Sequence, residues 1–443
     1  MINLFEQFDK KTIVLYKSFK YAGIDRKTIV VEENGFLPDD VLSPYQFFSK
    51  NKTYTEQPLF FNQVKKPRFW QIEGSNNEAV IKNVDEIKAR IIYRPNYKFR
   101  IVERVEWLNK NGHTQYIDYY NKHGFKYAQV VLNPKNHRRT LKHFFNDKGQ
   151  IFMTENIITN DIMLNWKGKE YIFNSKVHFI IFYLRVNGID SESFLINSFL
   201  TTAAVLNNLE NAYNNTLFLQ QDVNDNTINH LENLLSKNNQ KYNIAVSNEE
   251  DYKEILLKIR EEWAHKVFKS GYVYKFLKSN LHGNRVLTLT NSDQLPHISD
   301  IIEENPHLEF HIAALTEMSN VLLSLKQYDN VRLYPGAKKQ KLVNLYKMCD
   351  VYLDINKGNE IMDSVRAAFD YKLLVLGYQE LAHNLEVTHQ ENLFSLESYQ
   401  VLCKTLKEVS LDEKQLNNRL KLQLTQAGAV DALTFKNSMK SKF

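Results

Sequence analysis

The side chains with the clearest chemical potential in this sequence stand in one short polar loop, at Gly358, Asn359 and Glu360. A carboxylate beside an amide at the rim of a cleft can bind a ligand by hydrogen bonds or exchange a proton with it. His311 and Tyr334 lie in two earlier apolar runs and are predicted to stand nearby. We treat these five residues as candidate cleft residues. Two plainer alternatives stay open: a lone histidine within a strand is more often a core residue, and Glu360 can simply complement a helix dipole.

The common signatures of catalysis are missing from the chain. There is no Walker loop, no G-x-G-x-x-G, no H-E-x-x-H and no G-x-S-x-G, and no cysteine or histidine cluster has metal-ligand spacing. An Asp-x-Asp pair, which a metal-dependent nucleotide-sugar enzyme would use to bridge a diphosphate, is also absent. We therefore predict no metal, no cofactor and no catalytic residue in this chain.

The polar loop is positioned by the best-formed pattern in the sequence, between residues 331 and 378. Its apolar spacing predicts a strand at 331–334, a helix, a strand at 351–355, a second helix capped by Asn359, and a buried strand at 373–376. Two crossovers in succession indicate a doubly wound parallel sheet. Ligands bind beyond the carboxyl ends of such strands, so the loop is expected at the rim of a cleft.

The same α/β rhythm is predicted on both sides of a different central region. At the start we expect a helical stretch to about residue 20 and a strand at 28–32; later, a strand at 179–184 and a helix at 193–211. A second unit begins near residue 285. The predicted organisation is a first Rossmann-like domain (1–64 and 177–275), an inserted β-meander (65–176), a second Rossmann-like domain (276–425) and a C-terminal tail (426–443).

The central region contains an internal repeat. The pattern aromatic, any residue, Asn, two residues, Gly occurs at 107–112, 119–124 and 144–149, and a degenerate copy occurs at 165–168. Asn and Gly tolerate the positive φ of tight turns, so each copy predicts a hairpin tip of an antiparallel meander. The wide face of such a sheet is available to a partner protein, although packing on the parent domain explains it nearly as well.

Composition narrows the classes of partner. The chain has 443 residues and a net charge of +6, with basic residues spread rather than clustered, which argues against nucleic acid. The two cysteines, Cys349 and Cys403, indicate reduced core thiols and a cytoplasmic setting. No signal-length or membrane-length apolar run is present. The lysines at 436, 440 and 442 allow at most a peripheral contact with the inner face of the cell membrane, although three such lysines more often serve only solubility.

The second unit resembles the C-terminal domain of two-domain retaining glycosyltransferases of the GT-B fold, in its V-R-L-Y-P-G, C-D-V-Y-L-D, N-E and L-L-V-L-G segments. In that family a Glu-x7-Glu pair serves the transferred sugar and the nucleotide ribose. The resemblance puts Glu360 or Asn359 at the first position, but Ala367 or Ala368 at the second. Losing a charged hydrogen bond weakens binding by about 10- to 150-fold.

The family also neutralises the donor diphosphate with an Arg and a Lys after the first strand of this domain. Here residues 289–300 contain His297 but no Arg or Lys, and the expected glycine-rich turn after the next strand reads Ala313-Ala314. Without those cations the leaving group loses its main electrostatic stabilisation. The donor chemistry is therefore expected to be lost although the fold persists.

The opening N-G-F-L-P-D-D-V-L-S-P-Y-Q-F-F, the hairpin repeats and the G-N-E-I loop together resemble a narrower family. This is the non-catalytic stabilising subunit of the two-protein O-linked N-acetylglucosaminyltransferase that modifies serine-rich-repeat adhesins in Gram-positive bacteria with the accessory Sec system. The resemblance implies that this chain forms a hetero-oligomer with a catalytic paralogue that uses UDP-GlcNAc. One form of this complex would be a heterotetramer. It also implies that the paralogue is held through the β-meander and that the Ser/Thr-rich acceptor binds in this chain's cleft.

Two other functions remain open at this stage. One is an active retaining glycosyltransferase with a divergent donor site, and the other is an unrelated α/β binding protein. Transfer or hydrolysis of a sugar nucleotide by the isolated chain would distinguish the first of them.

Overall fold

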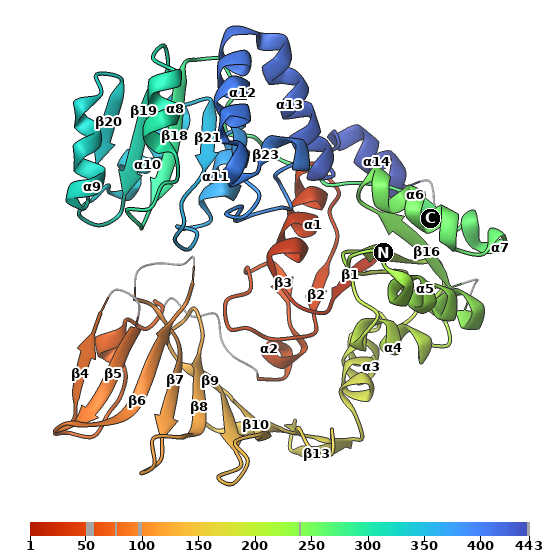
Figure 1. Cartoon of the computed structure of the whole chain (residues 1–443). Helices are drawn as coiled ribbons and strands as arrows, with labels where there is room; N and C mark the ends of the chain where they lie inside the picture. Colours follow the sequence, from red (N-terminus) through yellow and green to blue (C-terminus); the bar gives the residue numbers. More distant parts are fainter. Residues whose placement is uncertain (50–56, 76–77, 96–99, 239–240, 441–443) are drawn as a thin grey trace.

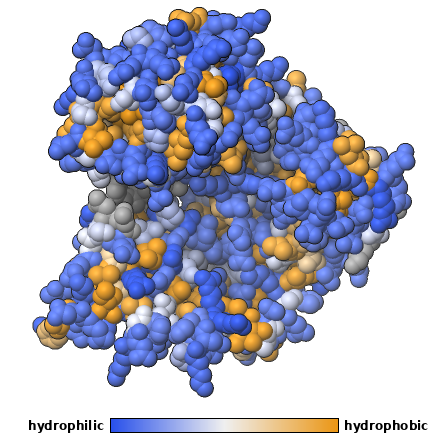
Figure 2. All heavy atoms as spheres, in the orientation of Figure 1, coloured by the Kyte–Doolittle hydropathy of each residue, from blue (hydrophilic) through white to orange (hydrophobic). Residues whose placement is uncertain are grey.

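The computed structural model describes residues 1–49, 57–75, 78–95, 100–238 and 241–440. Figure 1 shows two α/β units side by side and an antiparallel sheet that extends from the first unit beneath the second. Figure 2 shows that the surface is hollowed between the second unit and this sheet. The arrangement agrees with the predicted GT-B-like α/β fold carrying an inserted β-meander.

The first parallel sheet combines two separate parts of the chain, because β1 pairs with both β2 and β14. Its spatial order is β17-β16-β15-β14-β1-β2-β3. The strands are β1 (Ile2–Phe5), β2 (Thr28–Val30), β3 (Val41–Leu42), β14 (Phe194–Ile196), β15 (Asn215–Leu219), β16 (Tyr242–Val246) and β17 (Val267–Lys269). The helices of this unit are α1 (Lys10–Tyr21), α2 (Pro44–Ser49), α3 (Lys176–Val186), α4 (Thr201–Asn207), α5 (Asp225–Asn238), α6 (Glu249–Lys258) and α7 (Glu261–Ala264).

Three sequence predictions for this unit were wrong. The run at 179–184 is not a strand but the middle of α3, and its side chains are buried on nearly every side, so its apolar pattern is continuous. Periodicity cannot separate such a helix from a buried strand. The predicted helix at 193–211 begins instead with the central strand β14, and the predicted N-terminal helix is preceded by the central strand β1. Helix α1 begins only after Asp9, whose side chain accepts a hydrogen bond from the Thr12 N–H.

The meander is a single antiparallel sheet in which sequential strands are neighbours, from β13 to β4. Its strands are β4 (Gln71–Gly74), β5 (Glu78–Asn83), β6 (Glu86–Tyr93), β7 (Val102–Leu108), β8 (Thr114–Tyr120), β9 (Lys126–Leu132), β10 (Arg139–Phe145), β11 (Ile151–Asn156), β12 (Ile162–Trp166) and β13 (Lys169–Phe173). Such local pairing needs only short turns between strands.

The predicted hairpin tips are confirmed in their backbone geometry. Gly112, Gly124 and Gly149 have φ of 78°, 83° and 74°, values that favour glycine. In each copy the asparagine side chain accepts hydrogen bonds from the N–H groups two and four residues later, as Asn109 does from residues 111 and 113. The degenerate copy places both Lys167 and Gly168 at positive φ. The repeat is thus a turn device encoded locally.

The two faces of the meander have different surroundings. Directly opposed residues on successive strands share a face. One face carries the ladder Tyr119, Ala128, Phe144, Met153, Leu164 and Tyr171, which joins the core of the first unit. The other face carries the ladder Asp118, Gln129, His143, Thr154, Met163 and Ile172, which we call the outer ladder. At its end, Met163 and Ile172 are 43% and 66% exposed.

Aromatic stacking and an ion cluster join the meander to the first unit. The ring of Tyr45 on α2 stacks on Phe144 of β10, with 4.4 Å between the ring centroids. The Lys176 ammonium at the start of α3 lies 2.5 Å from a Glu32 oxygen and 3.1 Å from a Glu155 oxygen. These contacts link the two crossing points of the insertion to β10 and β11 of the meander. The sheet is therefore held at a defined angle.

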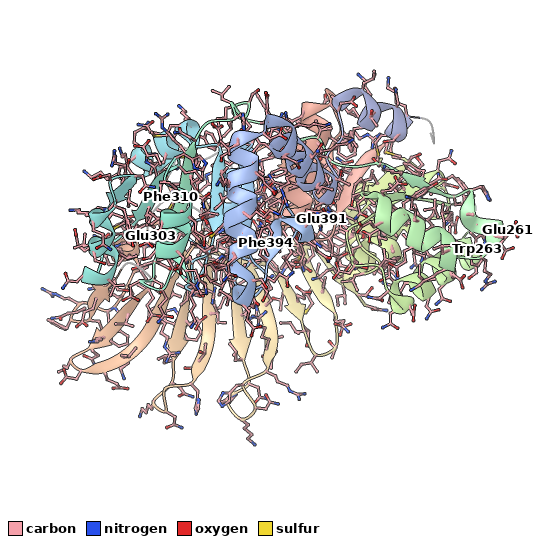
Figure 3. All side chains as sticks on the ribbon, turned by 45° about the horizontal axis from the view of Figure 1, so that its top comes forward. Glu261, Trp263, Glu303, Phe310, Glu391 and Phe394 are labelled. Atoms are coloured by element: carbon pink, nitrogen blue, oxygen red, sulfur yellow. The ribbon has the colours of Figure 1, made fainter. Side chains whose placement is uncertain are left out.

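The second unit is a parallel sheet in the order β20-β19-β18-β21-β22-β23. Its strands are β18 (Arg285–Thr290), β19 (Glu309–Ala314), β20 (Val331–Tyr334), β21 (Val351–Asp354), β22 (Leu374–Tyr378) and β23 (Leu393–Phe394). Its helices are α8 (Ile298–Glu304), α9 (Asn320–Leu323), α10 (Lys339–Met348), α11 (Ser364–Asp370), α12 (Tyr399–Leu411) and α13 (Glu413–Gln426). Phe310 and Phe394 belong to the core of this unit and Trp263 to that of the first (Figure 3).

The C-terminal segment, predicted to be a tail, contains a packed helix, α14 (Ala432–Lys440). Phe435 and Met439 are fully buried in the core of the first unit, together with Phe5 and Phe19. Figure 1 shows the chain leaving the second unit through α13 and returning to the first through α14. The end of the chain therefore ties the two units together.

Candidate functional site

The loop of residues 356–360, which follows β21, is fixed by an amide network. Asn356 accepts hydrogen bonds from Thr290 Oγ1 at 2.8 Å and from the Gly358 N–H at 3.2 Å. Its own Nδ2 donates to Asn291 Oδ1 at 3.1 Å and to the Asn359 carbonyl at 3.2 Å, and Asn291 Nδ2 donates to that same carbonyl. At Gly358 an added Cβ would lie 2.0 Å from Asn291 Oδ1. A side chain at this position would displace the Asn291 amide and with it the hydrogen bond that Asn291 Oδ1 accepts from Asn356.

The candidate carboxylate Glu360 lies at the start of a helix that begins later than predicted. Asn359 is not a helix cap, because α11 begins at Ser364 after two residues, Met362 and Asp363, with φ of 51° and 53°. Glu360 Oε1 accepts a hydrogen bond from the Val365 N–H at 3.1 Å, and so pairs with a backbone donor of the first turn that has no partner within the helix. Partial burial raises the pKa of Glu360 above its ordinary value. Glu360 therefore interacts with the first turn of α11, as the helix-dipole alternative expects, while it also lies in the loop that follows β21.

The structure joins His311 to Tyr334 but not to this loop. His311 Nδ1 lies 2.9 Å from the Tyr334 hydroxyl, and its Nε2 lies 3.3 Å from an oxygen of Glu309. The His311 side chain is 2% exposed, and its burial lowers its pKa. Since β18 lies between β19 and β21, two strand spacings of about 4.8 Å separate His311 from the strand that leads into the loop. The core alternative describes His311 better than a ligand-facing role does.

Sequence reasoning missed His383, which lies in the segment after β22. His383 Nδ1 donates to Asp354 Oδ1 at 2.6 Å, its Nε2 donates to the Gly358 carbonyl at 2.8 Å, and its N–H donates to Asp354 Oδ2 at 2.8 Å. The hydrogen bond to Asp354 raises the pKa of His383 to about 9. His383 and Asp354 are separated by 29 residues in the sequence, so no local motif predicts their contact.

A cavity of about 390 Å³ occupies the position where a doubly wound sheet usually binds its ligand, beyond the carboxyl ends of β18 and β19. Its lining consists of Thr290, Asn291, Ser292, Asp293, Ala314, Thr316, Glu317, Ser319 and Leu322. Among these described residues, two are acids and none is a base. A diphosphate placed here would meet negative charge and no cation, so its binding would be unfavourable.

The residues that stand where the glycosyltransferase family binds its donor have packing roles in this structure. Ala368 is fully buried in a core cluster of the second unit, and Ala367 packs beside it. His297 stacks on Tyr399 with 4.2 Å between the ring centroids, which commits its ring to a packing contact. These side chains offer neither the second carboxylate nor the cationic clamp of the glycosyltransferase family.

A second cavity, of about 380 Å³, lies between the two α/β units. Lys11 and Tyr272 contribute to it from the first unit, and Arg366 and Glu386 from the second. Among the described residues, two ion pairs cross the boundary: Lys10 Nζ lies 2.5 Å from Asp363 Oδ1, and Lys11 Nζ lies 3.7 Å from Glu386 Oε1. Asp363, three residues after the loop of residues 356–360 (hereafter the rim loop), thus connects the second unit to α1 of the first.

Two negative findings apply to the part of the chain that the structure describes. No three His, Cys, Asp or Glu side chains come together there in a way that could hold a metal ion. Within the same residues, no helix has the length and apolar character needed to cross a membrane.

Comparison with known proteins identifies a family with the same order of domains along the chain. Family models match in sequence along the chain: the GtfB N-terminal domain at residues 2–48, the GtfB middle domain at 70–174, the GtfB third domain at 176–257, and the GftB/GlyA-F C-terminal domain at 286–423. The middle-domain match falls on the meander.

Among curated relatives, the UDP-N-acetylglucosamine–peptide N-acetylglucosaminyltransferase stabilizing protein GtfB of Streptococcus agalactiae is 35% identical over 412 residues, 93% of each chain. The protein of the same description from Streptococcus gordonii is 33% identical over 444 residues, covering 100% of this chain and 98% of the relative.

Solved structures agree with these relatives. A chain in the crystal structure of a GtfA/B complex bound to UDP and GlcNAc matches with a TM-score of 0.93 and 32% identity, over 100% of this chain and 99% of the other. The Staphylococcus aureus enzyme TarM, 11% identical with a TM-score of 0.54, shares the fold alone. The predicted resemblance is confirmed: this chain belongs to the GtfB family of glycosyltransferase-stabilising proteins.

Proposed function

We propose that this chain is the non-catalytic, stabilising and acceptor-binding subunit of a protein O-GlcNAc transferase complex that glycosylates Ser/Thr-rich repeat adhesins before their export. Its relatives are named as stabilising proteins of such a transferase, and one structural neighbour comes from a GtfA/B complex. The observation that carries the proposal is the donor-type cavity beyond β18 and β19, which contains Asp293 and Glu317 but no base in its lining. Catalysis with UDP-GlcNAc then belongs to the paralogous partner.

The outer ladder of the meander is the surface that we assign to that partner. The opposite face of the meander packs against α2 and α3, whereas Met163 and Ile172 of the outer ladder are exposed. Figure 2 shows apolar side chains gathered on the meander, in the lower part of the view. Exposed apolar side chains of this size on a sheet face are typical of a protein interface. Asp118 is held by Trp107 and Gln129, so the polar start of the ladder is ordered as well.

The acceptor is proposed to bind at the rim formed by Gly358, Asn359 and Glu360. A Ser/Thr-rich peptide offers hydroxyl groups and backbone amides, which the Glu360 carboxylate and the exposed Asn359 amide can bind. Lys10 and Asp363 border the rim from the two units. Of the five predicted cleft residues, His311 and half-buried Tyr334 bond to each other on β19 and β20, and a part in acceptor binding stays a prediction for both.

The proposal places the protein in the cytoplasm, because the sugar nucleotide and the unexported acceptor are expected there. Any contact with the inner face of the cell membrane would be peripheral and electrostatic. The chain's net charge of +6 and the basic Lys436 and Lys440 on α14 support a weak contact of this kind.

Co-expression with the catalytic paralogue tests the proposal directly. The acceptor should be glycosylated efficiently only when both chains are present, and the isolated chain should neither hydrolyse UDP-GlcNAc nor transfer its sugar. Transfer or hydrolysis by the purified chain alone would overturn the proposal in favour of an active glycosyltransferase. A Glu360→Ala variant in the same assay separates the acceptor role from the stabilising role, since it should lower acceptor capture without dissociating the complex.

A further inference from the structure

The rim loop is hydrogen-bonded to His383, a mostly buried histidine that pairs with Asp354 and has no part in the proposed function as stated above. Asp354, the last residue of β21, is 2% exposed, and His383 is 15% exposed. Both oxygens of Asp354 accept hydrogen bonds from His383, one from the ring and one from the backbone N–H. This pairing satisfies a buried carboxylate that would otherwise be costly.

The geometry at His383 defines its protonation. Each ring nitrogen faces an oxygen that can only accept: Nδ1 faces Asp354 Oδ1, and Nε2 faces the carbonyl of Gly358. A neutral imidazole has one N–H and can serve only one of these acceptors, whereas an imidazolium serves both. Besides Asp354, the carboxylate of Glu360 favours the charged ring.

The bond from His383 to Gly358 is one of several hydrogen bonds that hold the backbone of this loop. The Gly358 N–H is held by Asn356, its carbonyl by His383, and the next carbonyl, of Asn359, by Asn291 and Asn356. Glu360 follows directly and is itself held by the Val365 N–H. The side chains of Asn359 and Glu360 are thus presented by a loop whose backbone polar groups are bound on its inner side.

We propose that His383 is a positioning residue for acceptor recognition: as an imidazolium clamped on Asp354 it holds the Gly358 carbonyl and thereby sets the direction of Asn359 and Glu360. This inference rests on the proposed acceptor role of the rim. His383 does not touch the acceptor; it acts through the loop. Removing its charge frees one side of the loop while leaving the asparagine network in place.

The test uses the complex of this chain with its catalytic paralogue and an unglycosylated Ser/Thr-rich repeat peptide as probe. His383→Gln should weaken capture of the peptide at pH 7 by about 10-fold, the lower end of the effect of a charged hydrogen bond. In the wild type, capture should fall as the pH rises through 9, and this dependence should be absent from the variant. A control variant, His307→Gln, changes an exposed histidine of the same unit that bonds to Ser410 and should leave capture unchanged.

A second measurement separates the two proposals. Hydrogen exchange at residues 356–360 should be faster in His383→Gln than in the wild type at pH 7, and the difference should shrink at pH 10. If Glu360→Ala weakens capture but His383→Gln does not, or if the variant retains the wild-type pH profile, the positioning role is overturned. If Glu360→Ala leaves capture unchanged, the acceptor role of the rim fails, and equal exchange rates in the two proteins would overturn the positioning role independently.

Discussion

The Asp354–His383 pair makes the stability of the second unit depend on pH in a definite direction. The pKa of His383 is about 9 in the folded protein against an ordinary 6.5. Because the folded-state pKa is raised, the stabilisation is fully present below pH 6.5, declines between pH 6.5 and 9, and is lost above pH 9. At 1.36 kcal/mol per pH unit the difference amounts to at most about 3.4 kcal/mol. Partial exposure of the ring reduces this to about 2–3 kcal/mol.

The perturbation is His383→Gln, which keeps one amide donor but removes the charge. At pH 6 the variant should unfold with a thermal midpoint about 5–10 °C below the wild type, since about 1 kcal/mol shifts a unit of this size by 2–4 °C. At pH 9.5 the two midpoints should nearly coincide. The assay is thermal unfolding followed by circular dichroism at pH 6, 7.5 and 9.5, with urea unfolding as an independent measure.

His307→Gln provides the matched comparison, because this histidine has a hydroxyl partner and no carboxylate partner. Its midpoint should stay within about 2 °C of the wild type at each pH, as expected for a surface substitution. The reasoning is refuted if the deficit of His383→Gln is the same at pH 6 and pH 9.5, since a constant deficit would reflect lost packing and not a charged pair.

Three further predictions address the rest of the molecule. Isothermal titration of the isolated chain with UDP-GlcNAc should show no binding tighter than about 1 mM, because the donor-type cavity has no cation in its lining; micromolar affinity would contradict this. Met163→Glu combined with Ile172→Glu should abolish co-purification with the catalytic paralogue, whereas Leu257→Glu, at a side chain 86% exposed on α6, should not; an intact complex would move the interface away from the outer ladder. Tyr45→Ala removes a buried ring that packs on Phe144 and Phe179, and should weaken the joint between the meander and the first unit by about 3–5 kcal/mol. Faster proteolytic release of the meander would show this, and unchanged proteolysis would mean that the joint is held elsewhere.

Structure encoded by neighbouring residues could be predicted from the sequence. The Asn-x-x-Gly tips were recognised because the asparagine side chain and the glycine φ act within four or five residues. The crossovers around β20, β21 and β22 were recognised because each strand and helix has its own period. In both cases the decisive interactions are local, so they leave a local pattern.

Structure that depends on distant partners could not be predicted. The helix at 179–184 has no visible helical period because neighbours from α2 and the meander bury it on several sides. Helix α11 starts late because Met362 and Asp363 have positive φ, and Asp363 pairs with Lys10, 353 residues away in the sequence. His383 belongs to the rim only through contacts with Asp354 and Gly358 that no spacing rule connects. The position of the loop after β21 could be predicted from the sequence, whereas its contact with His383 could not.

The packing of α14 against β1 has a consequence for how the chain folds as it is synthesised. The central strand β1 needs β14, nearly 200 residues later, and its core is completed only by Phe435 and Met439 at the far end of the chain. The meander pairs only neighbouring strands, so its contacts have short sequence separation and can form early. During translation the inserted sheet can therefore fold while its parent domain is still incomplete, which makes the first unit the last to close and the one most exposed to misassembly.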